Sequence, residues 1–356
     1  MGGAKIAALT AFACLAGAAP AAAAPGFLGR GHDPGVAVDT AGTAHVAWLA
    51  EAANGTGTLE YCQVPRGTRA CALRRSVGVA DDGFGKVQVL LPRPGLIQIV
   101  APLLEPAALA TSADGGNTFA VAQLGERLPA IEQALAGPGD SISLMSGSGP
   151  GRFGRFGPDG SGPGKLPVEF APATDSLETS LAPWGGGYVA FFSGLKARSA
   201  LWSGAGDPNA PQSWIPGPSL GSADVPSAVG GRSGTWVAYV RRGGRQATYV
   251  RRLRASGRFG PQRRVVRGDP FELAFVQGPR GDMALVYGTG SGRAMVVRSR
   301  TGRRWTRPRQ LFRGHDPQDL RAALGPRGGW LVWDSHPGNA GMHPIRIAAL
   351  PGPPRR

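Results

Sequence analysis

Six acidic side chains recur at one position of a pattern that repeats along this chain. Each stands shortly before a turn glycine that opens a short apolar run. Acidic residues are only 23 of the 356 in the chain, so chance is a poor explanation of the recurrence. The six acids are Asp33, Glu132, Glu178, Asp224, Glu272 and Asp319, and Lys86 stands at this place in one further unit.

Carboxylates gathered at one site support two kinds of chemistry. In glycoside hydrolysis one carboxyl group donates a proton, and a second acts as base or nucleophile. In a binding site, carboxylates hold a cation or a basic ligand. The candidate catalytic residues are Glu132, Glu178 and Glu272, and the candidate binding acids are Asp33, Asp224 and Asp319.

The same acids also have a structural interpretation. Aspartate favours turns because its side chain accepts backbone N–H bonds, and an inner arginine such as Arg321 would pair with a neighbouring carboxylate. Calcium requires six to eight oxygen ligands at close range. We therefore predict no metal and no other cofactor, with a calcium ion in the channel as the alternative.

A repeated pentapeptide and a series of apolar runs indicate the fold class. Arg-Gly-His-Asp-Pro occurs at Arg30–Pro34 and at Arg313–Pro317, and we expect both copies to form turns between units. The turn glycines follow one another at about 45 to 53 residues, which is the spacing of β-propeller blades. The apolar runs are 42–48, 95–100, 140–144, 187–192, 234–239, 281–286 and 329–333. The sequence predicts an all-β, seven-bladed β-propeller with four-stranded antiparallel blades and little helix; six blades is the alternative.

The propeller is expected to form one domain. It spans residues 25–351, with blades that start near residues 33, 81, 129, 175, 222, 270 and 316, followed by a short basic tail at 352–356. Residues 1–24 have the charged start, apolar stretch and small final residues of a secretory signal peptide. No later apolar segment is long enough to span a membrane. We predict a secreted monomer, with association with the cell envelope as an alternative.

Two cysteines, Cys62 and Cys71, flank a predicted hairpin turn. In an exported chain such a pair predicts a disulfide between neighbouring strands. A zinc site would need further ligands nearby, and redox catalysis would favour a Cys-x-x-Cys spacing. We therefore expect a structural disulfide.

Arginine gives the chain a formal net charge of +16. The arginines cluster in residues 241–267 and 293–313, which are predicted outer strands. A basic face on an exported protein favours an anionic polysaccharide or a cell-envelope polymer as partner. Nucleic-acid recognition is disfavoured because no ladder of stacking aromatics accompanies the arginines, and a solvated surface that reflects base composition is the alternative. The candidate binding arginines are Arg251, Arg252, Arg254, Arg298 and Arg300.

Residues 112–119, Ser-Ala-Asp-Gly-Gly-Asn-Thr-Phe, match the Asp-box motif Ser-x-Asp-x-Gly-x-Thr-Trp/Phe. In this motif the aspartate accepts backbone N–H bonds, a glycine takes a positive φ, and the aromatic ring packs into the blade. A degraded copy at residues 299–305 keeps the serine, the glycine and the tryptophan. The structural residues of the intact copy are Ser112, Asp114, Gly116, Thr118 and Phe119.

On these motifs the chain resembles the sialidase-like, Asp-box (BNR-repeat) propellers. It looks most like exported actinobacterial members with a Tyr-Cys-x-x-Pro-Arg-Gly…Cys hairpin, here residues 61–71. In that family the Asp-box is structural and lies far from the axial active site. Sialidases place their first carboxylate-binding arginine in an Arg-Ile-Pro motif, and no such motif stands near the start of this chain. The resemblance therefore implies the fold and a non-catalytic member.

Together these features predict an exported binding module for an anionic glycan or an envelope component, without a recognisable catalytic site. Two alternatives stay open. One is a glycoside hydrolase or lyase with a non-standard carboxylate pair, and the other is a scaffold for an envelope protein.

Overall fold

The computed structural model describes residues 24–51, 57–80, 86–101, 107–125, 131–146, 151–163, 166–170, 176–194, 200–204, 208–221, 223–241, 246–268, 270, 272–314, 317–335 and 343–352. The predicted signal peptide, apart from its last residue, lies outside these residues. So do His315 and Asp316 of the second pentapeptide and residues 353–356 of the basic tail.

Strands make up almost all of the regular structure. In chain order they begin with β1 (Gly26–Val38), β2 (Ala44–Glu51), β3 (Gly57–Val64), β4 (Leu73–Ala80), β5 (Gln88–Arg93), β6 (Leu96–Ala101), β7 (Ala107–Ser112), β8 (Ala120–Leu124), β9 (Ile131–Ala136), β10 (Ile142–Ser146), β11 (Arg152–Phe156), β12 (Val168–Glu169), β13 (Ser176–Trp184) and β14 (Gly187–Gly194). They continue with β15 (Ala200–Gly204), β16 (Trp214–Pro216), β17 (Ala223–Val229), β18 (Thr235–Arg241), β19 (Ala247–Leu253), β20 (Arg263–Arg267), β21 (Leu273–Gln277), β22 (Met283–Thr289), β23 (Arg293–Ser299), β24 (Arg309–Arg313), β25 (Pro317–Gly325), β26 (Gly328–Ser335) and β27 (His343–Leu350). Two single 3-10 turns, η1 (Pro138–Asp140) and η2 (Pro211–Ser213), are the helical elements of the described chain, and it holds no helix long and apolar enough to cross a membrane.

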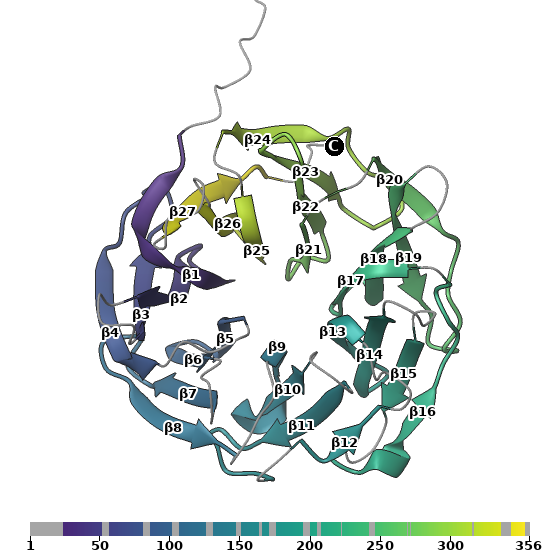
Figure 1. Ribbon diagram of the computed structural model, residues 1–356, viewed down its shortest axis with the longest axis horizontal. Coiled ribbons are helices and arrows are strands. Elements are labelled where there is room, and N and C mark those ends of the chain that lie inside the picture. The colour runs from purple at the N-terminus through teal and green to yellow at the C-terminus, as the bar shows by residue number, and fades with distance from the viewer. Residues whose placement is uncertain are drawn as a thin grey trace, which may run out of the picture.

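The strands form antiparallel sheets that stand around a central axis (Figure 1). Five sheets have four strands each, in chain order: β5–β8, β9–β12, β13–β16, β17–β20 and β21–β24. The other strands join in one sheet with the order β25-β26-β27-β1-β2-β3-β4. The prediction of an all-β propeller with four-stranded antiparallel blades and little helix is confirmed.

Each predicted apolar run overlaps the second strand of its repeat unit. These strands are β2, β6, β10, β14, β18, β22 and β26. All residues of β6 and β10 are buried. A second strand is buried because other sheets cover both of its faces, so it lacks the alternation of a half-exposed strand.

Strand β1 closes the ring because it takes part in two sets of strands. Its residues 26–31 pair with β27, and its residues 32–38 pair with β2. Gly31 allows the crossing, since a Cβ there would overlap the Leu49 carbonyl oxygen. The first pentapeptide, Arg30–Pro34, spans the crossing. It lies inside strand β1, with a bulge at Asp33, so the prediction of a turn between units at this copy was wrong.

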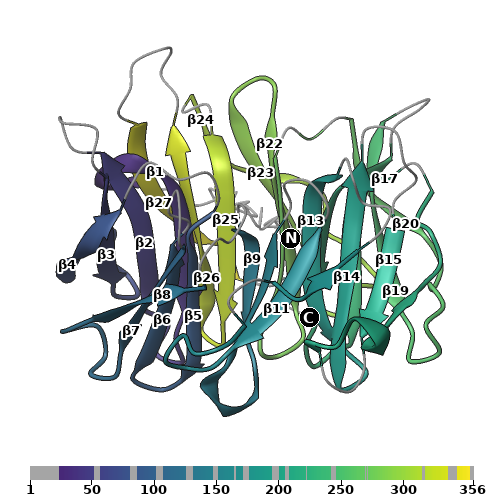
Figure 2. The same ribbon diagram turned by 60° about the horizontal axis from the view of Figure 1, so that its bottom comes forward.

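The ring has two faces with different loops (Figure 2). Because consecutive strands in a sheet are antiparallel, turns between first and second strands lie at the same end as turns between third and fourth strands. We call this end the turn face; residues 230–234 and 299–305 belong to it. The first strands begin at the opposite end, which we call the mouth face, near Lys86 and Glu132.

The hydrophobic core is divided among the spaces between neighbouring sheets. Ile97 and Ile99 of β6 pack with Leu49 and Tyr61 of the sheet that contains β2 and β3. Other buried clusters fill the spaces between the following sheets in the same way. Each blade is therefore stabilised by its two neighbours.

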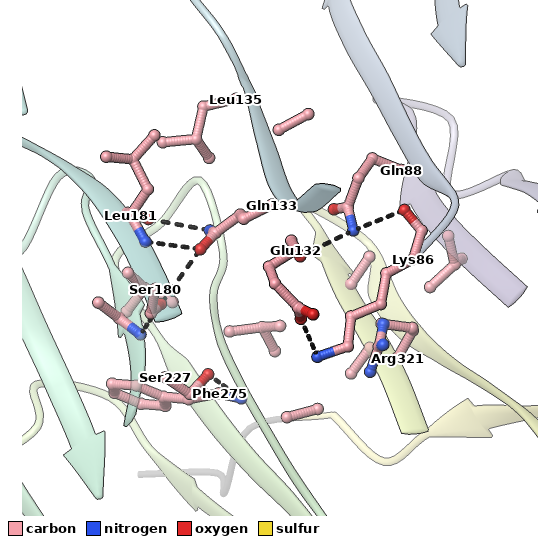
Figure 3. A pocket seen from close by; sticks show the side chains of 18 of the residues that line it. Lys86, Gln88, Glu132, Gln133, Leu135, Ser180, Leu181, Ser227, Phe275 and Arg321 are labelled. Carbon is pink, nitrogen blue, oxygen red and sulfur yellow. Dashed lines mark hydrogen bonds and ion pairs between the residues drawn. The ribbon is translucent and has the colours of Figure 1, made fainter. Parts of the chain in front are cut away.

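Side chains of β5, β9, β13 and β17 each bond to the first strand of the next sheet around the axis (Figure 3). The Gln133 side chain on β9 accepts a bond from the Leu181 N–H on β13 at 2.6 Å and donates one to the Leu181 carbonyl at 2.9 Å. One sheet earlier, the Gln88 amide on β5 donates to the Glu132 carbonyl on β9 at 3.3 Å.

Two serines continue this series on the next sheets. Ser180 on β13 accepts a bond from the Ala228 N–H on β17 at 2.7 Å. Ser227 on β17 accepts one from the Phe275 N–H on β21 at 3.2 Å. We call Gln88, Gln133, Ser180 and Ser227 the latches. They occupy equivalent places in their repeat units, so each of these units makes the same kind of contact with the next sheet.

Cys62 on β3 and Cys71 form the predicted disulfide, with their Cα atoms 5.5 Å apart. It ties β3 to the segment that precedes β4. The two strands are neighbours in the sheet, so the bond reinforces an existing hairpin.

The Asp-box segment forms the turn between β7 and β8. Oδ1 of Asp114 accepts bonds from the N–H groups of Thr118 and Asn117, both at 3.0 Å. These bonds, that from Thr118 first, hold the pKa of Asp114 well below its usual range because they stabilise the charged form. Phe119 packs edge-on against Tyr61, with ring centroids 5.0 Å apart. The contacts have the form that the motif predicts, while membership of the Asp-box family stays a prediction.

Replacing Gln133 with alanine should lower the free energy of unfolding by about 1–3 kcal/mol, because both backbone groups of Leu181 lose their partner. Urea denaturation measures this change. Gln310→Ala, at an exposed position on β24, is the control and should change stability by less than about 0.5 kcal/mol. Equal effects of the two substitutions would contradict the role given to the latches.

Candidate functional site

The first strands surround a cavity of about 500 Å³ on the axis (Figure 3). Much of its wall is strand backbone with small or apolar side chains, such as Ala134 and Ala228. Ionisable side chains also line it, and they come from residues at or near the starts of the first strands. They are Lys86, Glu132, Glu272, Asp319 and Arg321.

Four of these ionisable groups form two ion pairs. Lys86 Nζ lies 2.6 Å from Glu132 Oε2, and Arg321 Nη2 lies 3.7 Å from Asp319 Oδ1. The pairing with Arg321 is the structural role that the sequence left open for the acids. Both pairs are partly exposed to solvent, so each contributes little to stability.

Glu272 differs from the other acids that line the cavity. Within the described part of the chain its carboxyl group has no ion-pair or hydrogen-bond partner. Burial raises its pKa, and the nearby Asp319 charge raises it further, whereas Arg321 and Lys86 lower it. Glu272 therefore keeps a proton to higher pH than an exposed glutamate.

A second acidic group lies beside β1 and β26. His32 Nδ1 and Asp33 Oδ2 are 2.8 Å apart. Asp334 is only 1% exposed, and burial raises its pKa to about 8. The charges of Asp319 and Asp33 act in the same direction.

Among the described residues, no group of three or more His, Cys, Asp or Glu side chains is placed to hold a metal ion.

The structure brings together only some of the six predicted acids. Glu132, Glu272 and Asp319 line the cavity. Asp33 and Asp319 both lie close enough to the buried Asp334 for their charges to raise its pKa. Asp224 lies on β17 opposite Val240 and does not line the cavity. The backbone of Glu178 is part of β13, but its side chain lies outside the described part of the chain.

Backbone geometry explains part of the recurrence of acids. Asp33, Val225 and Asp319 have positive φ angles of 52°, 48° and 44°. Each lies where the pairing of the first strand with the second shifts its register. Aspartate tolerates this left-handed conformation better than most residues, whereas a β-branched valine is strained there. Two of the six acids thus occupy positions that favour aspartate for local reasons.

The candidate arginines do not share one surface. Arg298 is 4% exposed and donates from Nη2 to Asp282 Oδ2 at 2.8 Å, so it is a buried structural side chain and not a surface contact. The cause is its place on β23, where the turn residue Asp282 supplies a counter-charge. Arg251 is half-buried, lies 4.7 Å from the centroid of the Phe259 ring and donates to the Gly260 carbonyl at 3.0 Å.

The other three candidates line one groove on the turn face, between the sheets β17–β20 and β21–β24. The groove has a volume of about 800 Å³, and seven exposed arginines line it. No carboxylate is among its lining residues in the described chain. We call this the arginine groove; its arginines are Arg232, Arg252, Arg254, Arg263, Arg280, Arg300 and Arg303.

Trp236 forms part of the floor of the arginine groove. It is buried, and the Arg252 guanidinium lies 6.0 Å from its ring centroid. The turn that carries Arg300 approaches the other side of this ring at Gly302, where a Cβ would lie 2.5 Å from the indole. Gly302 has a φ of +71°, so glycine serves both the turn and the close approach.

The degraded Asp-box supplies part of the basic charge. Where the intact copy has Asp114, the degraded copy has Thr301, and arginines stand at 300 and 303. Ser299 keeps the turn, because its Oγ accepts a bond from the Gly302 N–H at 2.8 Å. The serine–glycine bond thus remains in a turn that is one residue shorter, while the charge of the turn changes from negative to positive.

Sequence reasoning missed four members of the groove: Arg232, Arg263, Arg280 and Arg303. Arg232 and Arg280 lie in turns between first and second strands, outside the runs of arginine that attract attention in the sequence. Both stand in the turn before a repeat glycine, two residues before Gly234 and one before Gly281, and this shared turn is the signal that would have found them. Arg263 lies on β20 and donates to the Arg303 carbonyl at 3.1 Å, which joins the two sheets across the groove.

The sequence matches no protein-family model and no curated protein. Solved structures match the fold. A polysaccharide lyase, an ulvan lyase, has a TM-score of 0.55 at 11% identity and covers 91% of this chain and 95% of its own. The chain has a β-propeller fold.

Two further solved propellers are similar at the same level. A mutant of AofleA from Arthrobotrys oligospora has a TM-score of 0.51 at 12% identity over 77% of this chain and 89% of that chain. A mutant of the Aleuria aurantia lectin in complex with Fucα1-6GlcNAc has a TM-score of 0.50 at 12% identity over 80% and 96%. Identities this low establish the fold alone.

The free energy of unfolding should fall as pH rises from about 4 to 8. In the folded state Asp334 keeps its proton up to a pKa of about 8, whereas in the unfolded chain it loses the proton above its usual pKa of 3.8. Asp334→Asn removes this dependence. The variant should gain more than about 1 kcal/mol relative to the wild type between pH 5 and pH 8. Chemical denaturation at the two pH values measures the gain, and a difference that does not change with pH would contradict the account.

Proposed function

We propose that this β-propeller is a binding module for an acidic polysaccharide, which it holds in the arginine groove. The observation that carries the proposal is the groove, with seven exposed arginines and no carboxylate among its described lining residues. Guanidinium groups bind carboxylate, sulfate and phosphate groups through paired hydrogen bonds. A polymer reaches several of these arginines at once, so individually weak contacts add up.

Carbohydrate is the proposed class of polymer for a second reason. Propellers of this fold include a lectin in complex with a disaccharide and a polysaccharide lyase. The match is to the fold and not to their sites, so it supports the class of ligand and gives no residue of the site. The acidic character of the ligand rests on the arginine groove alone.

The protein is proposed to act outside the cell as a monomer. The disulfide between Cys62 and Cys71 is of the kind that persists in oxidising compartments, and residues 1–24 have the pattern of a signal peptide. The ring is proposed to have seven blades. Strands β25–β27 with residues 26–31 of β1 then make one blade, and residues 32–38 of β1 with β2–β4 make the next.

Replacing Arg252, Arg254 and Arg300 together with glutamine should weaken binding of an acidic polysaccharide at least about tenfold, because three of the guanidinium contacts are lost. Isothermal titration with a uronic-acid oligosaccharide measures the change. Wild-type binding should also weaken as salt rises from low to physiological concentration, since salt screens exposed charges.

The control removes the same charge from another part of the surface. Arg307, Arg309 and Arg313 are exposed and do not line the groove. Changing these three to glutamine should alter the affinity less than about twofold if the contact is local rather than a long-range effect of net charge. Equal losses from both triple variants would contradict the groove as the site.

Glycoside hydrolysis at the channel is a second candidate function, favoured by one observation. Glu272, with its raised pKa, lines the cavity together with Asp319, which is paired with Arg321. A carboxyl group with a raised pKa beside one that pairs with a cation matches the arrangement that hydrolases use. Glu272 would donate a proton to the leaving oxygen, while Asp319 would take a proton from the attacking water.

If this second function holds, Glu272→Gln should lower the rate of glycan cleavage at least about a hundredfold, because an amide does not donate the required proton. Release of reducing ends from a panel of polysaccharides measures the rate. The arginine-groove variant should reduce cleavage through weaker binding only. A wild type that releases no reducing ends from any member of the panel would exclude hydrolysis of those polymers.

A further inference from the structure

Three cavities on the turn face adjoin one another, and we call them together the track. The arginine groove shares Arg252 with a second cavity of about 630 Å³. That second cavity shares Trp184 and Leu253 with a third of about 390 Å³. Like the groove, neither of these cavities has a carboxylate among its described lining residues.

The second cavity differs from the arginine groove in chemistry. Proline and glycine make up much of its wall, together with Trp184, Tyr188 and the glycine turn 185–187. Arg155 and the shared Arg252 are its charged lining residues. We call this cavity the tryptophan cleft. It offers a flat apolar surface next to a strongly basic one.

The indole of Trp184 is held in place and remains accessible. Its Nε1 donates to the Arg254 carbonyl at 3.2 Å, which ties it to the start of the turn that follows β19. One side packs against the buried cluster that contains Leu253. The side chain is half-buried.

An accessible tryptophan ring beside a basic groove favours an acidic polysaccharide over other polyanions. Pyranose rings have an apolar face of C–H groups that packs on a flat aromatic ring, and an acidic polysaccharide joins such rings to anionic groups along one chain. A single-stranded nucleic acid needs several stacking rings in succession. Tyr188 and Trp236 are 7% and 5% exposed, which leaves Trp184 as the accessible ring among the described lining residues of the track.

We infer that the tryptophan cleft is a second subsite, which takes a sugar ring of the same chain whose acidic groups lie in the arginine groove. The inference rests on the proposed function and deepens it, because it makes the ligand an extended acidic polysaccharide and not a compact anion. Arg252, which lines both cavities, is the point where the chain passes from one subsite to the other.

The test compares oligosaccharides of increasing length with an anionic chain that has no sugar. Isothermal titration uses oligogalacturonides from dimer to octamer and inorganic polyphosphate of similar charge. The wild type should bind the octamer at least about tenfold more tightly than the dimer, because the longer chain reaches both subsites. Trp184→Ala should remove most of that gain and leave polyphosphate binding within about twofold. Trp184→Leu keeps an apolar contact with Leu253 but no flat ring, and it should lose the gain as well.

The outcomes separate the two proposals. If the wild type binds no oligogalacturonide and no other acidic glycan, the proposed function fails whatever Trp184 does. If the wild type binds and both variants keep the full length dependence, the subsite is wrong while the groove stands. An equal loss of polyphosphate binding in the variants would show that Trp184 acts through Arg254 and is not a sugar subsite. Tighter binding of single-stranded DNA than of the octamer would overturn the choice of polysaccharide.

Discussion

The structure depends on hydrogen bonds that cross from one first strand to the next around the axis. Gln133 meets both backbone groups of Leu181 on the next sheet, and Ser180 and Ser227 repeat this contact further along. Each latch occupies the same place in its unit, so the repeat builds the ring. The circle is completed because β1 pairs with both β27 and β2, which joins the two ends of the described chain in one sheet.

Charge is distributed unevenly around the ring, although each face carries both signs. First strands begin at the mouth face, where their bulges admit aspartate and where lysine and arginine neutralise part of the acid. Hairpin turns gather on the turn face, where exposed arginines line the arginine groove and no carboxylate is among its described lining residues. An anionic chain is therefore attracted to the arginine groove and meets a different environment at the channel. The latches keep the sheets on both sides of the groove at a fixed separation.

Much of the fold was predictable from the sequence, because turn glycines and fully apolar second strands recur with the length of a blade. The disulfide was predictable from two cysteines in one hairpin. The candidate site was less accessible. Asp33 and Asp319 have positive φ angles, which give these aspartates a structural role in the backbone. A single sequence does not show φ angles, so it does not distinguish this role from a role in catalysis or binding. Arg298 and Arg300 are two residues apart, yet one is buried against Asp282 and the other is exposed in the groove. Arg298 lies on β23 and Arg300 lies in the turn after it, so the end of the strand and the position of a counter-charge decide between them.

Hydrogen–deuterium exchange with and without an acidic octasaccharide tests the central claim most directly, because it reports where the ligand lies without any substitution. Binding in the arginine groove predicts slower exchange of backbone amides in residues 230–234, 254–262 and 299–305, with the first strands at the mouth face unchanged. Protection confined to the starts of β5, β9 and β21 would place the ligand in the axial channel and would contradict the account.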